Sequence, residues 1–188
     1  MKTLRKTAEE AYLKYANKII NRETWIDGFI SGIQYKKEYP QSIELCGLLW
    51  DTEDLAIGGY EKDGRHYYTW REAMDAAKSV GKRLPTKAEW KALCDLGSTW
   101  DDERKGRWFG GNHNSDHKGS LFLPAAGLRY SNSGELAYTS SYGYYWSSSP
   151  NYGGNSYASS LYFSSGSVFP LNNLNRAHGF SVRCVQNK

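Results

Sequence analysis

The stretch from Leu136 to Asn175, LAYTSSYGYYWSSSPNYGGNSYASSLYFSSGSVFPLNNLN, contains no Asp, Glu, Lys or Arg. Because charged residues make up 23% of the chain, about nine would be expected in a stretch of this length. Tyr, Ser, Asn and Gly take their place. In antibody paratopes the same mixture combines rigid Tyr contacts with adaptable polar ones. Trp146, Phe163 and Phe169 are apolar anchors that a disordered linker would lack. The tract therefore predicts a folded binding surface.

The overall composition narrows the classes of function. The 188 residues, 39% of them hydrophobic, suffice for one domain with an appendage and a sizeable core. The net charge of +4 comes from segments of mixed sign, so we expect no nucleic-acid partner. No stretch is long and apolar enough to predict a membrane span. The basic N-terminus lacks the apolar core of a secretory signal, which favours a cytoplasmic protein or a component of a phage particle.

Residues 1–40 are predicted to form a helical segment. Trp25, Phe29 and Ile33 recur there at helical spacing. Two such helices cannot bury their apolar stripes alone, so packing on each other as a helical hairpin, packing on the main domain and homo-oligomerisation are all open. The main domain is expected to comprise residues 41–188.

Two helices and several short strands are predicted within the main domain. Capping boxes and closing glycines mark the helices at residues 69–80 and 86–96. Long loops separate the later strands, and long ordered loops on a small sheet are usually functional. Apolar or alternating segments predict strands at residues 43–50, 120–124, 143–146, 158–163 and 178–185.

Five motifs follow one another in the main domain: RLPTKAEWKAL, LFLPAAGLRY, GYYWSSS, AxxLYF and RxxGFSVRCV. In this series residues 43–188 resemble the Fibrobacter succinogenes major paralogous domain, a branch of the C-type lectin fold. They also resemble the variable proteins of diversity-generating retroelements. The resemblance implies an α+β, C-type lectin-like fold: two helices pack on small antiparallel sheets, and the N- and C-terminal strands lie side by side. It also implies that residues 146–185 form a variable, ligand-binding region.

The residue types of the late tract agree with diversification at Asn codons. Substitution of the adenines in an AAY codon cannot produce Lys, Glu, Gln, Met or Trp, and residues 151–180 contain none of the five. A fixed Tyr- and Ser-rich loop would show the same absence. A fixed-specificity adhesin or lectin-like module is therefore the main alternative.

Residue type and strand alternation divide the tract into scaffold and ligand-facing positions. The ligand is expected to be a protein or a glycan, and about half of the ligand-facing positions should touch it. The ligand-facing candidates are Asn151, Tyr152, Asn155, Ser156, Tyr157, Ser159, Tyr162, Ser164, Ser167, Phe169, Leu171, Asn172, Asn173, Leu174, Asn175 and His178.

Catalytic chemistry is weakly indicated. The resemblance also extends to formylglycine-generating enzymes, but only Cys184 of the three cysteines lies in the late region. His113, Asp116 and His117 stand in a glycine-rich segment, which favours a solvated loop over a metal site. We therefore expect no catalytic residue, metal or cofactor. The expected role is receptor or surface recognition in a phage or bacterium.

Two arginines are expected to be structural. The resemblance places Arg129 and Arg183 inward, each paired with a carboxylate, with Glu89 and Glu44 as the candidates. Removing one partner of such a buried pair would leave an uncompensated charge.

Overall fold

A computed structural model describes residues 42–111, 117–151 and 156–188. The chain divides into two units, Met1–Pro40 and Gln41–Lys188, and all described residues belong to the second. The predicted N-terminal helical segment, with its expected packing or oligomerisation, lies outside the described residues. Among the described residues, no helix is long and apolar enough to cross a membrane.

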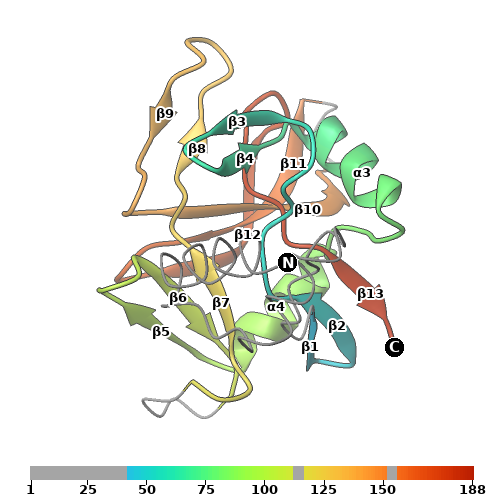
Figure 1. Cartoon of the computed structure of the whole chain (residues 1–188), viewed down its shortest axis with the longest axis vertical. Helices are drawn as coiled ribbons and strands as arrows, with labels where there is room; N and C mark the ends of the chain where they lie inside the picture. Colours follow the sequence, from blue (N-terminus) through green and yellow to red (C-terminus); the bar gives the residue numbers. More distant parts are fainter. Residues whose placement is uncertain (1–41, 112–116, 152–155) are drawn as a thin grey trace, which may run out of the picture. The chain divides into compact units, whose positions relative to one another are not determined.

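The described residues are mostly β, which makes the predicted α+β, C-type lectin-like fold class wrong. Thirteen short strands form five small antiparallel sheets, and they are accompanied by two short helices (Figure 1). The elements in chain order are β1 Ser42–Leu45, β2 Leu48–Asp51, β3 Tyr60–Lys62, β4 Arg65–Tyr67, α3 Trp70–Ser79, α4 Lys87–Asp95, β5 Ser98–Asp101, β6 Gly106–Phe109, β7 Leu121–Pro124, β8 Leu128–Arg129, β9 Leu136–Ala137, β10 Gly143–Pro150, β11 Tyr157–Phe163, β12 Val168–Asn175 and β13 Val185–Asn187.

Local capping signals set both helices, and both predicted helices are confirmed. The Thr69 side chain accepts a hydrogen bond from the Glu72 backbone, and the Glu72 carboxylate accepts one from the Thr69 backbone at 2.8 Å. Thr86 and Glu89 form the same reciprocal pair at the start of α4. Each box satisfies two backbone N–H groups that the first helical turn leaves free. A capped turn therefore fixes where each helix begins.

The predicted single strand at residues 43–50 is instead a hairpin of β1 and β2. Cys46 and Gly47 adopt left-handed backbone angles, with φ of 52° and 76°, and reverse the chain between the strands. Trp50 is fully buried and pairs with Ile43 in β1 and with Val185 in β13. The first described strand pair and the last strand therefore share one sheet, which confirms that the N- and C-terminal strands lie side by side (Figure 1).

The longest strands form the β10–β11–β12 sheet, in which β11 is central and β12 is an edge. Strands predicted at residues 143–146 and 158–163 are confirmed within β10 and β11. Strand β12 was not predicted. The strand predicted at residues 178–185 is wrong for most of its length: only its last residue begins β13, and the rest joins its neighbours through isolated bridges.

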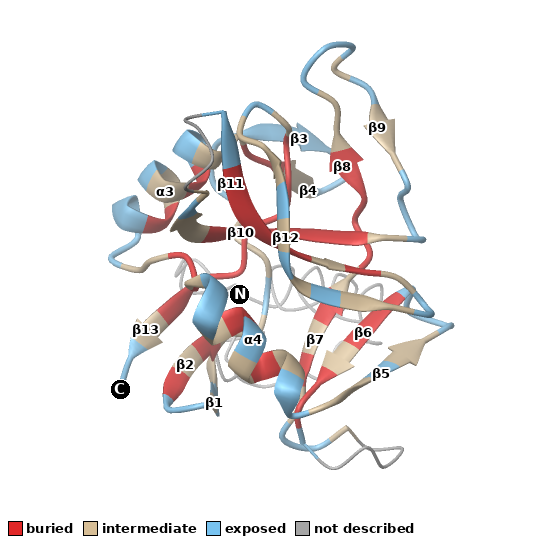
Figure 2. Ribbon diagram, turned by 180° about the vertical axis from the view of Figure 1, so that it is seen from behind, coloured by how far each residue is buried: buried red, intermediate tan, exposed pale blue. Residues whose placement is uncertain are grey.

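Two apolar clusters pack on opposite sides of the β10–β12 sheet. Trp90 and Leu93 of α4 pack with Leu161 in one cluster, while Ala73 of α3 packs with Trp146 in the other. Figure 2 shows β10 and most of β11 in the buried colour, whereas β12 alternates between intermediate and exposed. Burying each large apolar side chain contributes about 1.5–3 kcal/mol, so the two clusters hold β10 and β11 firmly.

A buried ion pair joins the end of the chain to the loop after β2. The Arg183 guanidinium is 1% exposed and donates to Asp54 Oδ1 at 2.6 Å and to the Asp51 carbonyl at 2.9 Å. The Tyr145 hydroxyl donates to the same Asp54 carboxylate at 3.0 Å. The prediction that Arg183 pairs with a carboxylate is thus confirmed. The predicted partners, Glu89 and Glu44, are wrong, because the partner is Asp54.

The same expectation fails for Arg129. Its guanidinium lies 4.4 Å from the centre of the Tyr60 ring. Glu89 instead pairs with Arg83 at 2.7 Å, and Glu44 pairs with Lys188 at 3.1 Å. An arginine that stacks on an aromatic face gains a cation–π contact, which replaces the predicted ion pair.

Candidate functional site

The β11–β12 hairpin carries most of the predicted ligand-facing residues, and these residues are more exposed on β12 than on β11. Tyr152 and Asn155 lie outside the described residues. The exposed candidates are Ser156, Tyr157, Phe169, Leu171 and Asn173. The half-buried ones are Asn151, Tyr162, Ser164, Ser167, Asn172, Leu174, Asn175 and His178.

Ser159 is a correction to the predicted set, because it is buried with 2% of its surface exposed. It lies on the central strand between β10 and β12, and its hydroxyl donates to the Asn172 carbonyl at 3.4 Å. A central strand has neighbours on both edges and clusters on both faces. Alternation of side chains along the sequence is therefore insufficient to place a residue in solvent.

A buried arginine fixes the turn of the hairpin. Arg107 of β6 donates to the carbonyls of Ser164 and Ser165, each at 2.8 Å, and to the Ser98 hydroxyl at 2.6 Å. Burial lowers the pKa of Arg107, although not enough to discharge it near neutral pH. We name this contact the turn clamp. It satisfies two backbone carbonyls that the turn leaves without partners.

A second arginine fixes the open end of the hairpin. The Arg176 guanidinium donates to the Tyr157 carbonyl at 2.9 Å and lies 4.2 Å from the centre of the Trp70 ring in α3. The Arg176 backbone N–H also donates to the Ser156 carbonyl at 2.8 Å. We name this contact the end clamp. Together the two clamps restrict the hairpin at both ends, so that its outward side chains are presented on a fixed backbone.

Five aromatic rings form a continuous surface beside the hairpin, which we name the ring surface: Tyr130, Tyr138, Tyr142, Tyr162 and Phe169. Neighbouring ring centres lie 6.5 Å apart for the first pair, then 4.9, 5.5 and 5.7 Å for the successive pairs along this series. The first three pairs are edge-on or tilted and the last is stacked, and such spacings are those of favourable aromatic pairs.

A buried layer supports the ring surface. Tyr144 lies 5.2 Å from both Tyr162 and Phe180, measured between ring centres. Burial raises the pKa of Tyr144 and of Tyr162, and a hydrogen bond to Tyr138 raises that of Tyr130. These phenols are therefore uncharged at neutral pH.

Sequence reasoning missed the first three rings of this surface. Tyr138 and Tyr142 stand in the charge-free tract but before residue 151, where the candidate set began. Tyr130 stands before the tract altogether, in a segment with ordinary charge content. The composition of the charge-free tract could have indicated Tyr138 and Tyr142 as candidates. Nothing in the sequence around Tyr130 indicates it, and only the tertiary structure places its ring beside the others.

His178 borders the ring surface in a neutral form. Its ring centre lies 5.8 Å from that of Tyr130, and its Nδ1 accepts a hydrogen bond from the Ser131 backbone at 3.2 Å. Burial lowers the pKa of His178 below its ordinary value of 6.5. The acceptor role of Nδ1 leaves the proton on Nε2, so the side chain adds an uncharged donor to this region.

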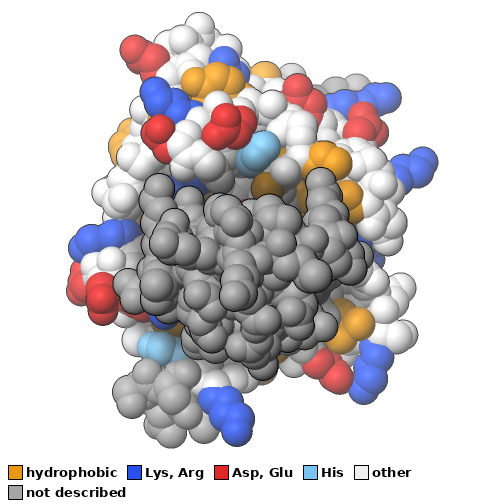
Figure 3. Space-filling model, viewed as in Figure 1, with side chains coloured by type: hydrophobic (Ala, Val, Ile, Leu, Met, Phe, Trp, Pro, Cys, Tyr) orange, Lys and Arg blue, Asp and Glu red, His pale blue; other side chains and the backbone are white. Residues whose placement is uncertain are grey.

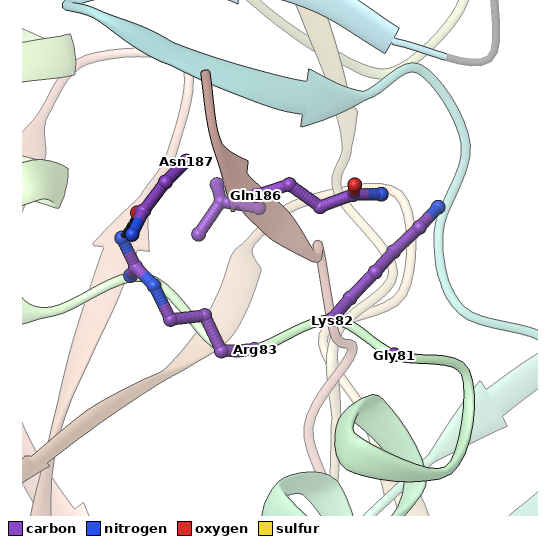
Figure 4. A pocket seen from close by; sticks show the side chains of 6 residues that line it. Gly81, Lys82, Arg83, Gln186 and Asn187 are labelled. Atoms are coloured by element: carbon purple, nitrogen blue, oxygen red, sulfur yellow. Dashed lines mark hydrogen bonds between the residues drawn. The ribbon is translucent and has the colours of Figure 1, made fainter.

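A separate pocket of about 370 Å³ lies between the loop after α3 and β13. Figure 4 shows Arg83 reaching toward Asn187 while Lys82 extends away from them. Arg83 donates to Asn187 Oδ1 at 2.8 Å and pairs with Glu89, and Lys82 pairs with Asp51 at 2.7 Å. Because both cations already have partners, the pocket is better explained as a structural cleft than as an anion site.

Charged side chains show no single-sign pattern around these features. On the face seen in Figure 3, acidic and basic side chains alternate over the described elements. Neither a basic stripe for phosphates nor an acidic cluster for cations is present on that visible part of the described residues.

The described residues supply little for metal or thiol chemistry. No group of three or more His, Cys, Asp or Glu side chains among them could hold a metal ion. His113 and Asp116 lie outside the described residues, while the His117 ring stacks on Trp108 with centres 4.4 Å apart. Burial raises the pKa of Cys184 to about 12, so its thiol is protonated near neutral pH.

Residues 94–185 match a protein family described as a domain of unknown function (DUF8237). The match covers just under half of the chain and includes strands β5 to β12. The comparisons with curated proteins and with solved structures returned no match. The ring surface and the turn clamp thus fall within the matched region, whereas the end clamp also uses Trp70, which lies outside it. The family's description assigns no activity to that region.

Proposed function

We propose that this chain is a non-enzymatic binding protein that recognises a macromolecular ligand with the outward side chains of the β11–β12 hairpin. The observation that carries the proposal is the exposure of three large apolar side chains there: Tyr157 at 46%, Phe169 at 54% and Leu171 at 49%. They come from a tract of forty residues without a charge. Phe169 and Leu171 lie two residues apart on the edge strand β12, and Tyr157 lies at the open end of the hairpin, opposite Asn175. Several exposed apolar groups on one hairpin favour an interaction surface, whereas single ones are ordinary.

The clamps support a binding role over simple packing. Binding is weakened when a surface must lose conformational freedom on contact, so a surface fixed in advance binds more tightly. The turn clamp and the end clamp order the hairpin without covering its outward side chains. Tyr and Phe then offer large contact area at low entropic cost, with Asn and Ser as adaptable hydrogen-bonding groups.

Diversification of this surface is a further part of the proposal, in line with the resemblance to variable proteins of diversity-generating retroelements. If the hairpin is diversified, variants of the gene should differ at exposed positions such as 157, 169, 171 and 173 and agree at buried ones such as 161. Sequencing the gene and its flanking DNA tests this. A nearby reverse transcriptase and a repeat copying the 3′ end would support diversification, and their absence would favour a fixed-specificity adhesin.

The binding role can be tested with a triple variant, Tyr157→Ser, Phe169→Ser and Leu171→Ser. The probe is a phage-displayed library of random peptides selected on the wild-type full chain. The variant should lose binding to the selected peptides by at least about tenfold, because truncating anchor residues removes most of an interface's energy. Its melting temperature should stay close to that of the wild type, since all three side chains are half exposed.

A matched control removes three equally exposed apolar side chains elsewhere: Ile57→Ser, Val80→Ser and Leu96→Ser, at residues that are 47%, 38% and 45% exposed. Peptide affinity should not change in this control. An equal loss of peptide affinity in both triple variants would mean that the peptides bind any exposed apolar side chain, and the proposal would fail. Unfolding of the hairpin variant would place its side chains in the core and would also contradict the proposal.

A further inference from the structure

Three tyrosines outside the predicted ligand-facing set share a surface with the hairpin. The Tyr142 ring meets that of Tyr162 at 5.5 Å, and Tyr138 meets Tyr142 at 4.9 Å. We infer that Tyr130, Tyr138 and Tyr142 are binding residues and that the ring surface they form with Tyr162 and Phe169 contacts an apolar, uncharged patch of a protein partner. This inference rests on the proposed function and deepens it.

The backbone at Tyr138 is the first argument. Its φ of 60° is left-handed, a conformation that is unfavourable for an aromatic residue. Its carbonyl accepts hydrogen bonds from the backbones of Ser141 and Tyr142 at 3.1 and 3.0 Å, which closes a tight turn. The loop also passes over Gly127 so closely that a Cβ there would lie 2.2 Å from the Ala137 carbonyl oxygen.

These contacts hold the Tyr138 backbone, but they do not require a tyrosine. The side chain is 46% exposed, so burial in the core does not repay the unfavourable backbone angle. Asn or Gly would suit that angle better. Within the chain the ring contacts Tyr142 and Tyr130, which belong to the same surface, and its hydroxyl accepts a hydrogen bond from Tyr130 at 3.2 Å. A half-exposed ring at a strained position, packed on two other rings of that surface, favours a contact with a partner.

The charge of the surface indicates the charge of the partner patch. The five rings are those of four tyrosines and a phenylalanine, and the charge-free tract supplies four of them. Arg129, which precedes Tyr130 in the sequence, lies over the Tyr60 ring. An anionic partner group would lose its hydration here without meeting a cation. A cationic group would gain about 0.5–2 kcal/mol from the rings, which is less than the several kcal/mol that its lost hydration costs. The complementary patch is consequently uncharged.

Exposed side chains without polar groups favour a protein partner over a glycan. Phe169 and Leu171 are about half exposed and carry no group that could bond to a sugar hydroxyl. Hydroxyls covered by these side chains would lose water partners without replacement. Apolar side chains of a protein would gain from the same burial, at about 25 cal/mol for each Å². The surface therefore fits a protein patch better than a carbohydrate.

The test uses the full chain and the same random-peptide library as the probe. Selected peptides should be rich in Leu, Phe, Trp and Tyr and poor in charged residues. Tyr138→Asn removes the ring with its contacts to Tyr142 and Tyr130 and suits the left-handed backbone. The two effects oppose each other and are of similar size, so the melting temperature should stay close to that of the wild type. Peptide affinity should fall about tenfold, as expected for an anchor residue. Tyr138→Phe keeps the ring and should keep most of the affinity.

A matched control is Lys105→Asn, because Lys105 also has a left-handed backbone, with φ of 51°, and lies far along the chain from the ring surface. It should relieve the same kind of strain and leave peptide affinity unchanged. Wild-type affinity in Tyr138→Asn would overturn the inference, and so would a drop of equal size in the control.

The outcomes also separate this inference from the proposed function. If the hairpin triple variant loses the peptides but Tyr138→Asn binds them normally, the proposed function stands and the inference fails. If both variants bind normally, the proposed function fails as well. A library that yields no binding peptide, beside an array of neutral oligosaccharides that does yield ligands, would overturn the protein class of partner. Failure of both probes would overturn it too.

Discussion

Strands β11 and β12 come from the same charge-free tract, pair with each other, and still meet the solvent in different ways. In β11, only Tyr157 is exposed and Tyr162 is half-buried, while the other five residues are buried. In β12, no residue is fully buried, and Phe169 and Leu171 are about half exposed. Neither strand carries a charged residue, so charge does not explain the difference, and position in the sheet does. A central strand is enclosed, and an edge strand offers its side chains to a partner.

The largest expected effect comes from two leucines on these neighbouring strands. Leu161→Ala should lower the free energy of unfolding by about 2–5 kcal/mol, because the side chain is fully buried and its removal leaves a cavity. Leu171→Ala should change it by no more than about 0.5 kcal/mol, because half of that side chain is already in water. Urea denaturation of both variants measures the difference. Similar losses in the two would mean that β12 is packed as tightly as β11.

The next effect concerns the turn clamp that joins the two strands. Arg107→Ala should cost about 1–3 kcal/mol, because it leaves the carbonyls of Ser164 and Ser165 without their donors. Hydrogen exchange at the Ser164 amide, which bonds to the Ser167 carbonyl, should accelerate. Arg71→Ala is the control: that side chain is 88% exposed, and its loss should cost no more than about 0.5 kcal/mol. An unchanged exchange rate at the Ser164 amide would show that Arg107 does not hold the turn.

The smallest expected effect concerns two neighbouring serines within β11. The buried Ser160 hydroxyl has no hydrogen-bond partner among the described residues, whereas the Ser159 hydroxyl bonds to the Asn172 carbonyl. Ser160→Ala should therefore stabilise the fold by up to about 1 kcal/mol, and Ser159→Ala should destabilise it by about 0.5 kcal/mol. Melting temperatures of the two variants should shift in opposite directions. Destabilisation by Ser160→Ala would show that its hydroxyl is bonded.

Local signals were sufficient for the helices but not for the class of fold. Thr69 with Glu72, and Thr86 with Glu89, place a capping box within four residues of sequence, and each box lies where it was expected. Most of the described strands pair with the next strand along the chain, and among them only β2 and β13 join distant segments. Several strands are only two to four residues long, too short to show an alternating pattern. The predicted α+β class overlooked several of these strands and therefore underestimated the β content.

Strand β12 shows why an edge strand escapes prediction. Its sequence, VFPLNNLN, contains a proline and three asparagines, all of which are rare inside sheets. Pro170 is tolerated because β12 has a neighbour on one edge only, and a bulge shifts its pairing with β11 between Ser160 and Tyr162. The segment at residues 178–184 failed in the opposite way. It alternates like a strand, but residues 179–184 are all buried, and residues 179–181 join their neighbours through isolated bridges.

The sequence by itself determined where charge is absent, where tyrosine and asparagine accumulate, and where two helices begin, because these depend on residue identity and on contacts within a few positions. Only the tertiary structure decided which of those uncharged side chains reach solvent. It buried Ser159, exposed Phe169 and brought Tyr130 to the hairpin. Exposure depends on the strands and helices that pack around a residue, and the helices α3 and α4 that pack with this sheet come from distant parts of the chain.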